Sequence, residues 1–214
     1  MNYYSFRERL AFSTQANGRT FEKIISDTLP GVARVEKTDT ATDKTGVDYV
    51  ATLRRGATVN VDLKLRDHGC RKFWRVSGEE LALETWSVKP APPTTIGKVG
   101  WTLDESKATH YTLHVFSPSD SDQVFLLPFQ LLRKAFRRNG RGWIKTFGPL
   151  REQSSGRWKS ECLFVPASVV LAAIAEASIS SARGLILLPE KRPELEQTTQ
   201  LSLFARVDPV AALG

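Results

Sequence analysis

Apolar and polar side chains alternate along residues 59–65, which is the pattern of a β-strand with two unlike faces. One face carries only branched apolar side chains, namely Val59, Val61, Leu63 and Leu65. The opposite face carries Asn60, Asp62 and Lys64. Residues 46–53 are also rich in β-branched and apolar side chains, and Arg54-Arg55-Gly56 between the two runs is a turn sequence. The pattern therefore predicts a β-hairpin over residues 46–65.

Helical spacing of apolar side chains marks three other stretches. The first is residues 18–29, which Pro30-Gly31 ends, and its apolar side chains are Phe21, Ile24, Ile25 and Leu29. The second is residues 129–139 with Gly140 as the C-cap, and its inward side chains are Phe129, Leu132 and Phe136. The same helix turns four basic side chains outward, namely Arg133, Lys134, Arg137 and Arg138. The third is the Ala-rich stretch 168–183, which we expect in the core.

Short apolar runs predict further strands at residues 32–35, 79–87, 110–116, 124–128 and 162–166. Residues 90–100 contain too many prolines and glycines for a regular element and are predicted to form a loop or flap. The order strand, proline, helix in residues 124–139 recurs in residues 162–183.

The amino-acid composition is typical of a globular protein. The 214 residues suffice for one substantial domain, with 41% hydrophobic and 25% charged residues. The two cysteines, Cys70 and Cys162, lack metal-site or redox spacing and favour a reducing compartment. Charged residues at 7–9 are unlike a signal peptide, and no apolar run is long enough for a membrane span. We therefore expect a cytoplasmic protein, in a bacterial or phage-infected cell if the resemblances given below hold.

Positive charge is concentrated in residues 133–159. This segment holds nine lysines and arginines against one acid, Glu152, a net of +8 that exceeds the +7 of the whole chain. Aromatic residues Trp143, Phe147 and Trp158 are interleaved with the basic ones. Such a segment is typical of nucleic-acid binding, because cations meet phosphates and rings stack on bases. The alternative is a basic helix followed by a hairpin that packs on the aromatic rings.

The polar face of residues 59–65 also carries candidate chemistry. Asp62 and Lys64 are two residues apart on one strand, so they point the same way about 6–7 Å apart. The hairpin partner can bring Asp48 beside them. Two close carboxylates repel unless a proton or a divalent cation neutralises them, and hard oxygen ligands suit Mg²⁺ or Mn²⁺.

Asp48, Asp62 and Lys64 resemble the core of the PD-(D/E)xK nuclease superfamily, in which an acid ends one strand and Asp/Glu-x-Lys lies on the next. Val47 stands where the eponymous proline would be, as in many members. The resemblance covers roughly residues 18–130. It implies an α/β (α+β) domain over residues 1–188, with a central mixed sheet flanked by helices as in restriction endonucleases.

The resemblance also implies roles for individual residues. Asp48, Asp62 and the main-chain carbonyl of Leu63 would hold Mg²⁺ or Mn²⁺, and Lys64 would orient or deprotonate the attacking water. Glu22 on the first helix would complete the metal shell, because several branches of the superfamily use a glutamate there; otherwise it is a solvated residue of the helix N-terminus. Glu84 falls on the polar face of its own strand and is either a further metal ligand or the partner of a lysine.

Residues 189–214 are poor in apolar side chains and are predicted to be a flexible tail. Within it, Gln200-Leu201-Ser202-Leu203-Phe204 resembles the pentapeptide with which bacterial replication and repair proteins bind the polymerase III β sliding clamp. The alternative is a terminal strand or helix that packs on the domain itself.

Together these features predict a Mg²⁺-dependent deoxyribonuclease that recognises DNA structure and is recruited by the clamp. Contacts to DNA are expected from eleven basic side chains: Lys44, Arg54, Arg55, Arg71, Lys72, Arg133, Lys134, Arg137, Arg138, Arg141 and Lys145. Three alternatives stay open, namely a non-cleaving DNA-binding protein, a restriction endonuclease, and a clamp-binding adaptor or inhibitor. The resemblance further implies a possible homodimer.

Overall fold

The structure is a computed structural model, and it describes residues 18–39, 42, 45–66, 79–91, 93, 95–116, 123–154 and 158–186. The chain divides into two compact units whose segments interleave in the sequence. The first unit comprises residues 1–80, 104–130 and 153–159. The second unit comprises residues 81–103, 131–152 and 160–214. Both contain helices and strands, so the chain is a mixed α and β protein.

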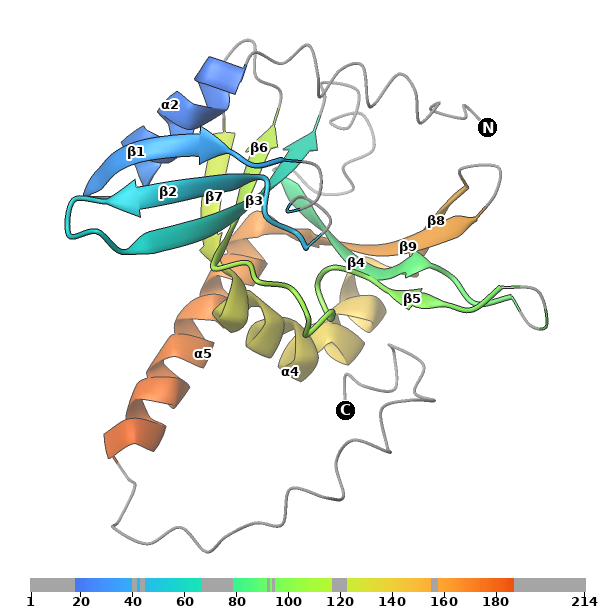
Figure 1. The fold of residues 1–214 in the computed structure, drawn as a ribbon. Coiled ribbons are helices and arrows are strands. Elements are labelled where there is room, and N and C mark those ends of the chain that lie inside the picture. Colours follow the sequence, from blue (N-terminus) through green and yellow to red (C-terminus); the bar gives the residue numbers. More distant parts are fainter. Residues whose placement is uncertain are drawn as a thin grey trace, which may run out of the picture. The chain divides into compact units, whose positions relative to one another are not determined.

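The first unit is built on a five-stranded sheet in the order β1-β2-β3-β6-β7 (Figure 1). Its strands are β1 (Val32–Lys37), β2 (Tyr49–Leu53), β3 (Thr58–Arg66), β6 (Tyr111–Phe116) and β7 (Gln123–Pro128). Strands β3 and β6 run parallel, and the other neighbours run antiparallel. The predicted mixed sheet is therefore confirmed.

Helix α2 (Gly18–Thr28) covers one face of this sheet at β1 and β2. Its side chains Phe21 and Ile25 are buried in a core cluster with Tyr49, Val61 and Leu113 of three different strands. The apolar row of β3 packs against the same cluster, as the alternation predicts: Val59, Val61, Leu63 and Leu65. The polar row of β3 therefore lies on the opposite face of the sheet.

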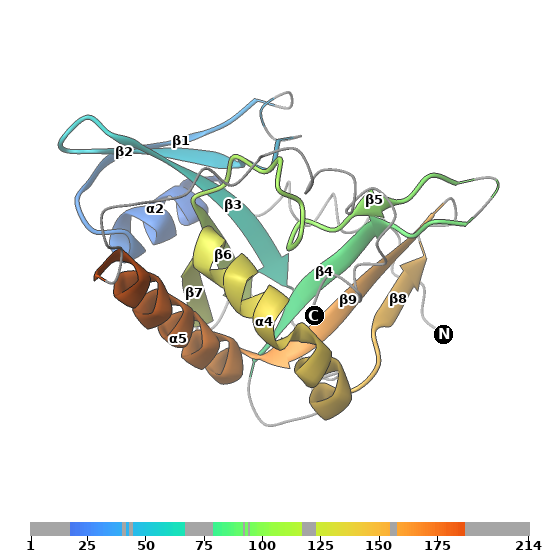
Figure 2. The same ribbon diagram turned by 90° about the horizontal axis from the view of Figure 1, so that it is seen from below.

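The second unit has a four-stranded sheet in the order β5-β4-β9-β8. Its strands are β4 (Glu80–Val88), β5 (Lys98–Val99), β8 (Arg151–Ser154) and β9 (Lys159–Pro166). Helix α4 (Phe129–Phe147) lies on one face of this sheet, and helix α5 (Ala167–Ile186) runs from the end of β9 (Figures 1 and 2). A second sheet was not expected from the sequence.

Helix α4 does not end at Gly140, so the predicted C-cap is wrong. The helix continues to Phe147 and ends at Gly148, which has a φ of 101°. Its apolar face continues because Gly140 is buried and Trp143 packs on Phe136, with ring centroids 6.2 Å apart. This packing outweighs the roughly 1 kcal/mol by which an internal glycine disfavours a helix.

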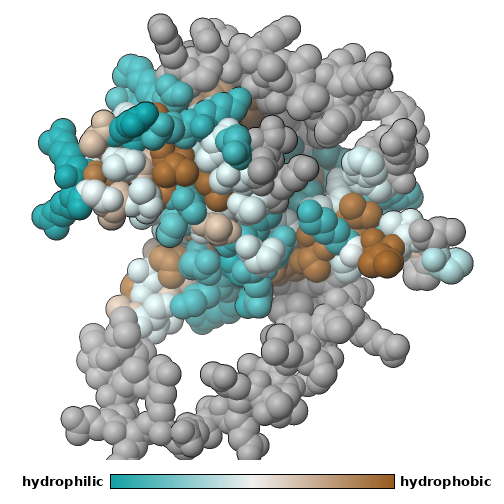
Figure 3. All heavy atoms as spheres, viewed as in Figure 1, coloured by the Kyte–Doolittle hydropathy of each residue, from teal (hydrophilic) through white to brown (hydrophobic). Residues whose placement is uncertain are grey.

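Residues 90–100 are not wholly a loop, which corrects a second prediction. Lys98 and Val99 form β5 and pair with β4, and Ala91 forms a bridge with Thr95. The hairpin leaves apolar surface exposed, since Ile96 is 95% exposed, and Figure 3 shows this hydrophobic patch at the β4–β5 hairpin. Among the described residues, no helix is long and apolar enough to cross a membrane.

Candidate active site

The first unit brings Asp48 beside β3 at the start of the hairpin. Asp48 precedes β2, and its N–H donates to the carbonyl of Val61 at 3.0 Å. The antiparallel register pairs Tyr49 with Val61, so one further step places Asp48 opposite Asp62. The backbone of Thr38, just beyond β1, donates to the Asp48 carbonyl at 2.9 Å. Asp48 is therefore fixed from both sides.

The carboxylate of Asp48 accepts a backbone hydrogen bond of β3 that a neighbouring strand would otherwise accept. Its Oδ2 accepts a 2.5 Å hydrogen bond from the N–H of Leu63. In a strand, the N–H and C=O of one residue point to the same side, so the Leu63 carbonyl also faces Asp48. The two oxygens predicted as metal ligands, from the Asp48 carboxylate and the Leu63 carbonyl, thus lie on the same side of β3.

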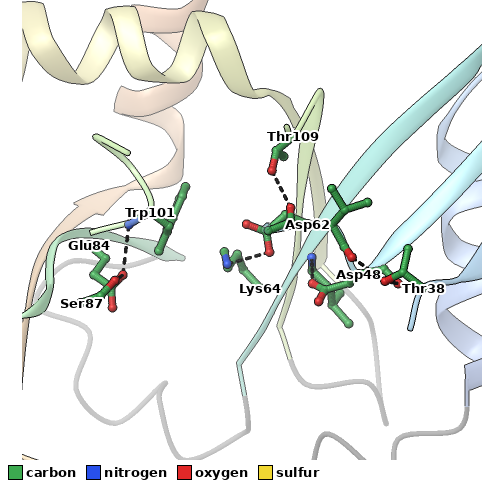
Figure 4. A network of polar contacts seen from close by, with 11 residues as sticks. Thr38, Asp48, Asp62, Lys64, Glu84, Ser87, Trp101 and Thr109 are labelled. Atoms are coloured by element: carbon green, nitrogen blue, oxygen red, sulfur yellow. Dashed lines mark hydrogen bonds and ion pairs between the residues drawn. The ribbon is translucent and has the colours of Figure 1, made fainter. Parts of the chain in front are cut away.

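Asp62 and Lys64 form an ion pair on the polar face of β3. The Nζ atom of Lys64 lies 2.7 Å from Oδ1 of Asp62. The side chain of Asp62 is 5% exposed and that of Lys64 is 26% exposed. Figure 4 shows Lys64 reaching Asp62, with Asp48 beside them. The structure therefore brings together the three residues that the sequence pattern singled out.

Strand β6 adds two buried polar residues to which the sequence pattern assigned no role in the site. Thr112 pairs in register with Asp62, and His114 pairs with Lys64. The Thr112 hydroxyl is buried and has no hydrogen-bond partner among the described residues. Burial, together with the charges of Lys64 and Arg66, lowers the pKa of His114 to about 3. The parallel pairing of β3 with β6, separated by 44 or more residues, could not be read from local periodicity.

Glu22 lies on helix α2, which packs against β1 and β2. Together with burial and Asp48, its charge raises the pKa of Tyr49 to about 12, and Tyr49 faces the core under α2. Among the residues that the structure describes, no three acidic, histidine or cysteine side chains form a group that could hold a metal ion. The role of Glu22 as a metal ligand stays a prediction.

Glu84 belongs to the second unit and has a local function there. Its Oε2 accepts hydrogen bonds from the Ser87 hydroxyl at 2.6 Å and from the Trp101 N–H at 3.1 Å. The neighbouring Gly100 lies against this strand so closely that a Cβ would be 2.3 Å from the Glu84 carbonyl oxygen. Glu84 therefore ties the returning chain to β4 (Figure 4).

Most of the predicted basic residues of α4 lie on one stripe of the helix. Lys134, Arg138, Arg141 and Lys145 are exposed, and their spacing of four, three and four residues puts them on one face. Arg137 is half-buried. The predicted outward position of Arg133 is wrong, because this residue is only 6% exposed. It follows Phe129 by four residues and precedes Phe136 by three, so it flanks the apolar face.

Of the other residues predicted to contact DNA, only two lie in the part of the chain that the structure describes. Arg54 and Arg55 are exposed at the β2–β3 turn, which Figure 3 shows as hydrophilic. Lys44, Arg71, Lys72 and the segment 200–204 lie outside the described residues.

The arrangement in the first unit supplies two carboxylates, a main-chain carbonyl and an ammonium on β3 and at the start of β2. These donors fit Mg²⁺, which commonly takes one or two carboxylates and keeps several waters. The ammonium beside Asp62 offers a positive charge for an anionic substrate. Comparison of the chain with protein-family models, with curated proteins and with solved structures finds no match.

Proposed function

We propose that the chain is a Mg²⁺-dependent DNA nuclease of the PD-(D/E)xK type. The observation that carries the proposal is the hydrogen bond from the Leu63 N–H to Asp48 Oδ2, which holds Asp48 against the strand of Asp62 and Lys64. Also in favour are the mixed sheet and the helix that precedes it. The order of acid, strand, then Asp-x-Lys on the next strand is that of the superfamily.

In this proposal Asp48, Asp62 and the carbonyl of Leu63 would hold Mg²⁺, which would polarise the phosphate and lower the pKa of a bound water. Lys64 keeps Asp62 oriented through their ion pair at 2.7 Å. Lys64 also orients the attacking water and stabilises the negative charge that grows on the phosphate oxygens. Water adds to phosphorus and gives up a proton, one P–O ester bond breaks, and the leaving oxygen takes up a proton.

DNA binding is assigned in the same proposal to the exposed stripe of α4. Four cations over twelve residues span about 16 Å of helix, enough to follow a phosphate backbone without reading bases. The segment 200–204 would tether the enzyme to the sliding clamp and raise its concentration at replicating DNA.

Cleavage of a panel of duplex, single-stranded, flap and branched DNAs with Mg²⁺ or Mn²⁺ tests the proposal. We expect the wild type to cleave at least one substrate and Asp62→Asn to be slower by a factor of about 10²–10³ or more. The matched control is Glu152→Gln, which removes an exposed acid of the second unit and should leave cleavage unchanged. Binding without cleavage by the wild type would favour the non-cleaving DNA-binding alternative instead.

A further inference from the structure

The segment before β6 is fastened to the loop that carries Asp48. The hydroxyl of Thr109 donates to the Gly46 carbonyl at 2.6 Å. Asn60 of β3 donates from its backbone to Nδ1 of His110 at 2.9 Å and from its side chain to the Ala108 carbonyl at 2.9 Å. The His110 N–H returns a bond to the Asn60 carbonyl at 3.0 Å. Residues 108–110 are thus held at a fixed place beside the acids, and Figure 4 shows Thr109 there.

This anchored segment carries Lys107 across Gly46. Gly46 has a φ of 82°, and a Cβ at this position would lie 2.4 Å from Cδ and 2.6 Å from Nζ of Lys107. Glycine is therefore required here for two reasons: it allows the positive φ, and it leaves room for the Lys107 side chain. Gly46 is two residues before Asp48, so the ammonium of Lys107 is delivered to the loop of the candidate site.

The ammonium of Lys107 differs from that of Lys64. Lys64 is engaged with Asp62, whereas Lys107 makes no side-chain hydrogen bond or ion pair with any residue in the described part of the chain. The residue is partly buried, which limits where its charge can go. The exposed Arg55 lies at the far end of the hairpin, at least about 13 Å along β3 from Asp62. In the part of the chain that the structure describes, Lys107 is therefore a cation placed to offset the repulsion between the carboxylates and a phosphate.

We propose that Lys107 binds a backbone phosphate of the DNA next to the scissile bond. This inference rests on the proposed nuclease function and adds a substrate-positioning residue to it. A lysine held by its stem acts as a point charge on a phosphate, and it releases about one counterion when it binds.

The test measures DNA affinity against salt concentration in the Asp62→Asn background with EDTA, so that neither cleavage nor metal contributes. Lys107→Met keeps the length of the stem and removes the charge. We expect it to lower affinity about 5- to 10-fold and to reduce the slope of log K against log salt by about one. Lys107→Arg should retain the affinity. The matched control is Lys23→Met on the exposed side of α2, where the lysine pairs with Asp27, and it should leave both quantities unchanged.

Cleavage kinetics separate the two proposals. With Asp62 intact, Lys107→Met should lower kcat/KM about tenfold while leaving the thermal unfolding midpoint within about 2 °C of the wild type. Unchanged affinity, salt slope and kcat/KM in Lys107→Met would overturn the inference and leave the nuclease proposal standing. Absence of cleavage by the wild type would overturn the nuclease proposal, and the salt slope would still decide whether Lys107 contacts phosphate.

Discussion

Two polar clusters in this protein have the same composition, two carboxylates and one lysine on or next to neighbouring strands, but they differ in their bonding. In the second unit, Lys89 bonds both acids, at 2.5 Å to Glu152 and at 2.8 Å to Glu161. In the first unit, Lys64 bonds Asp62, whereas the carboxylate of Asp48 accepts a bond from the backbone N–H of Leu63.

The difference separates a structural network from a candidate site. Around Lys89 every acid faces a cation, and Glu161 also accepts a hydrogen bond from Thr85 at 2.9 Å. The Lys89 ammonium already offsets the repulsion between these carboxylates, so a metal ion is not needed for that purpose. In the first unit, Asp62 accepts from the Lys64 ammonium and Asp48 accepts from the Leu63 N–H. The two carboxylates also lie at opposite register positions, which suits a cation that both acids share. Counting acids and lysines in the sequence would not distinguish the two.

The largest effect on stability is expected from removing the shared lysine of the second unit. Lys89→Met leaves Glu161, whose side chain is 7% exposed, without its ion pair. Because Lys89 itself is 37% exposed, we discount the usual cost of a broken buried pair and expect a loss of about 1–3 kcal/mol. Urea unfolding measures this, and adding Glu161→Gln in a double-mutant cycle should recover part of the loss. Equal losses with and without Glu161→Gln would contradict the network.

A second effect concerns pH and the buried histidine of the first unit. The pKa of His114 is lowered to about 3, whereas the unfolded chain takes up this proton near pH 6.5. The histidine therefore favours folding fully above pH 6.5, and this contribution is lost as the pH falls toward 3. Between pH 6.5 and 5 we expect the metal-free protein to lose about 2 kcal/mol for this reason.

Urea unfolding at pH 7, 6 and 5 in EDTA checks the histidine prediction. His114→Gln should flatten the loss over this window, whereas His110→Gln, at an exposed position, should leave it in place. A wild-type slope that survives His114→Gln would show that another group takes up the proton.

The smallest effect compares two fully buried threonines. Thr85 donates to Glu161, whereas the Thr112 hydroxyl, opposite Asp62, has no partner among the described residues. Thr85→Val should cost about 1–2 kcal/mol, because it leaves a buried carboxylate short of a donor. Thr112→Val should be neutral or stabilising by up to about 1 kcal/mol, because it removes a buried unsatisfied hydroxyl. Thermal unfolding of both variants measures the difference, and equal losses would contradict the assignment.

Local pattern was sufficient where one face of an element meets the core. The alternation in residues 59–65 predicted which side chains of β3 pack under α2 and that Asp62 and Lys64 share the other face. The turn at Gly56 was also predicted, and its φ of 82° confirms the need for glycine. These features depend on neighbours within a few residues of each other.

Features that depend on distant pairing could not be predicted. The second sheet joins residues 80–99 to residues 151–166, and β5 forms in a segment whose composition favours a loop. Packing of Trp143 on Phe136 carries α4 past Gly140, and the same face buries Arg133. Lys107 reaches Gly46 across 61 positions of sequence. In each case tertiary contacts outweigh local propensity.

The central claim is that the aspartate pair, and not the glutamate pair, forms an open site for a divalent cation. Titration of the protein with Mn²⁺, followed by calorimetry, tests it directly on the wild type, Asp48→Asn, Asp62→Asn and Glu152→Gln. We predict one binding event in the wild type that is retained in Glu152→Gln and is weakened at least tenfold in each aspartate variant. Binding that persists in both aspartate variants, or that is lost in Glu152→Gln, would contradict the account.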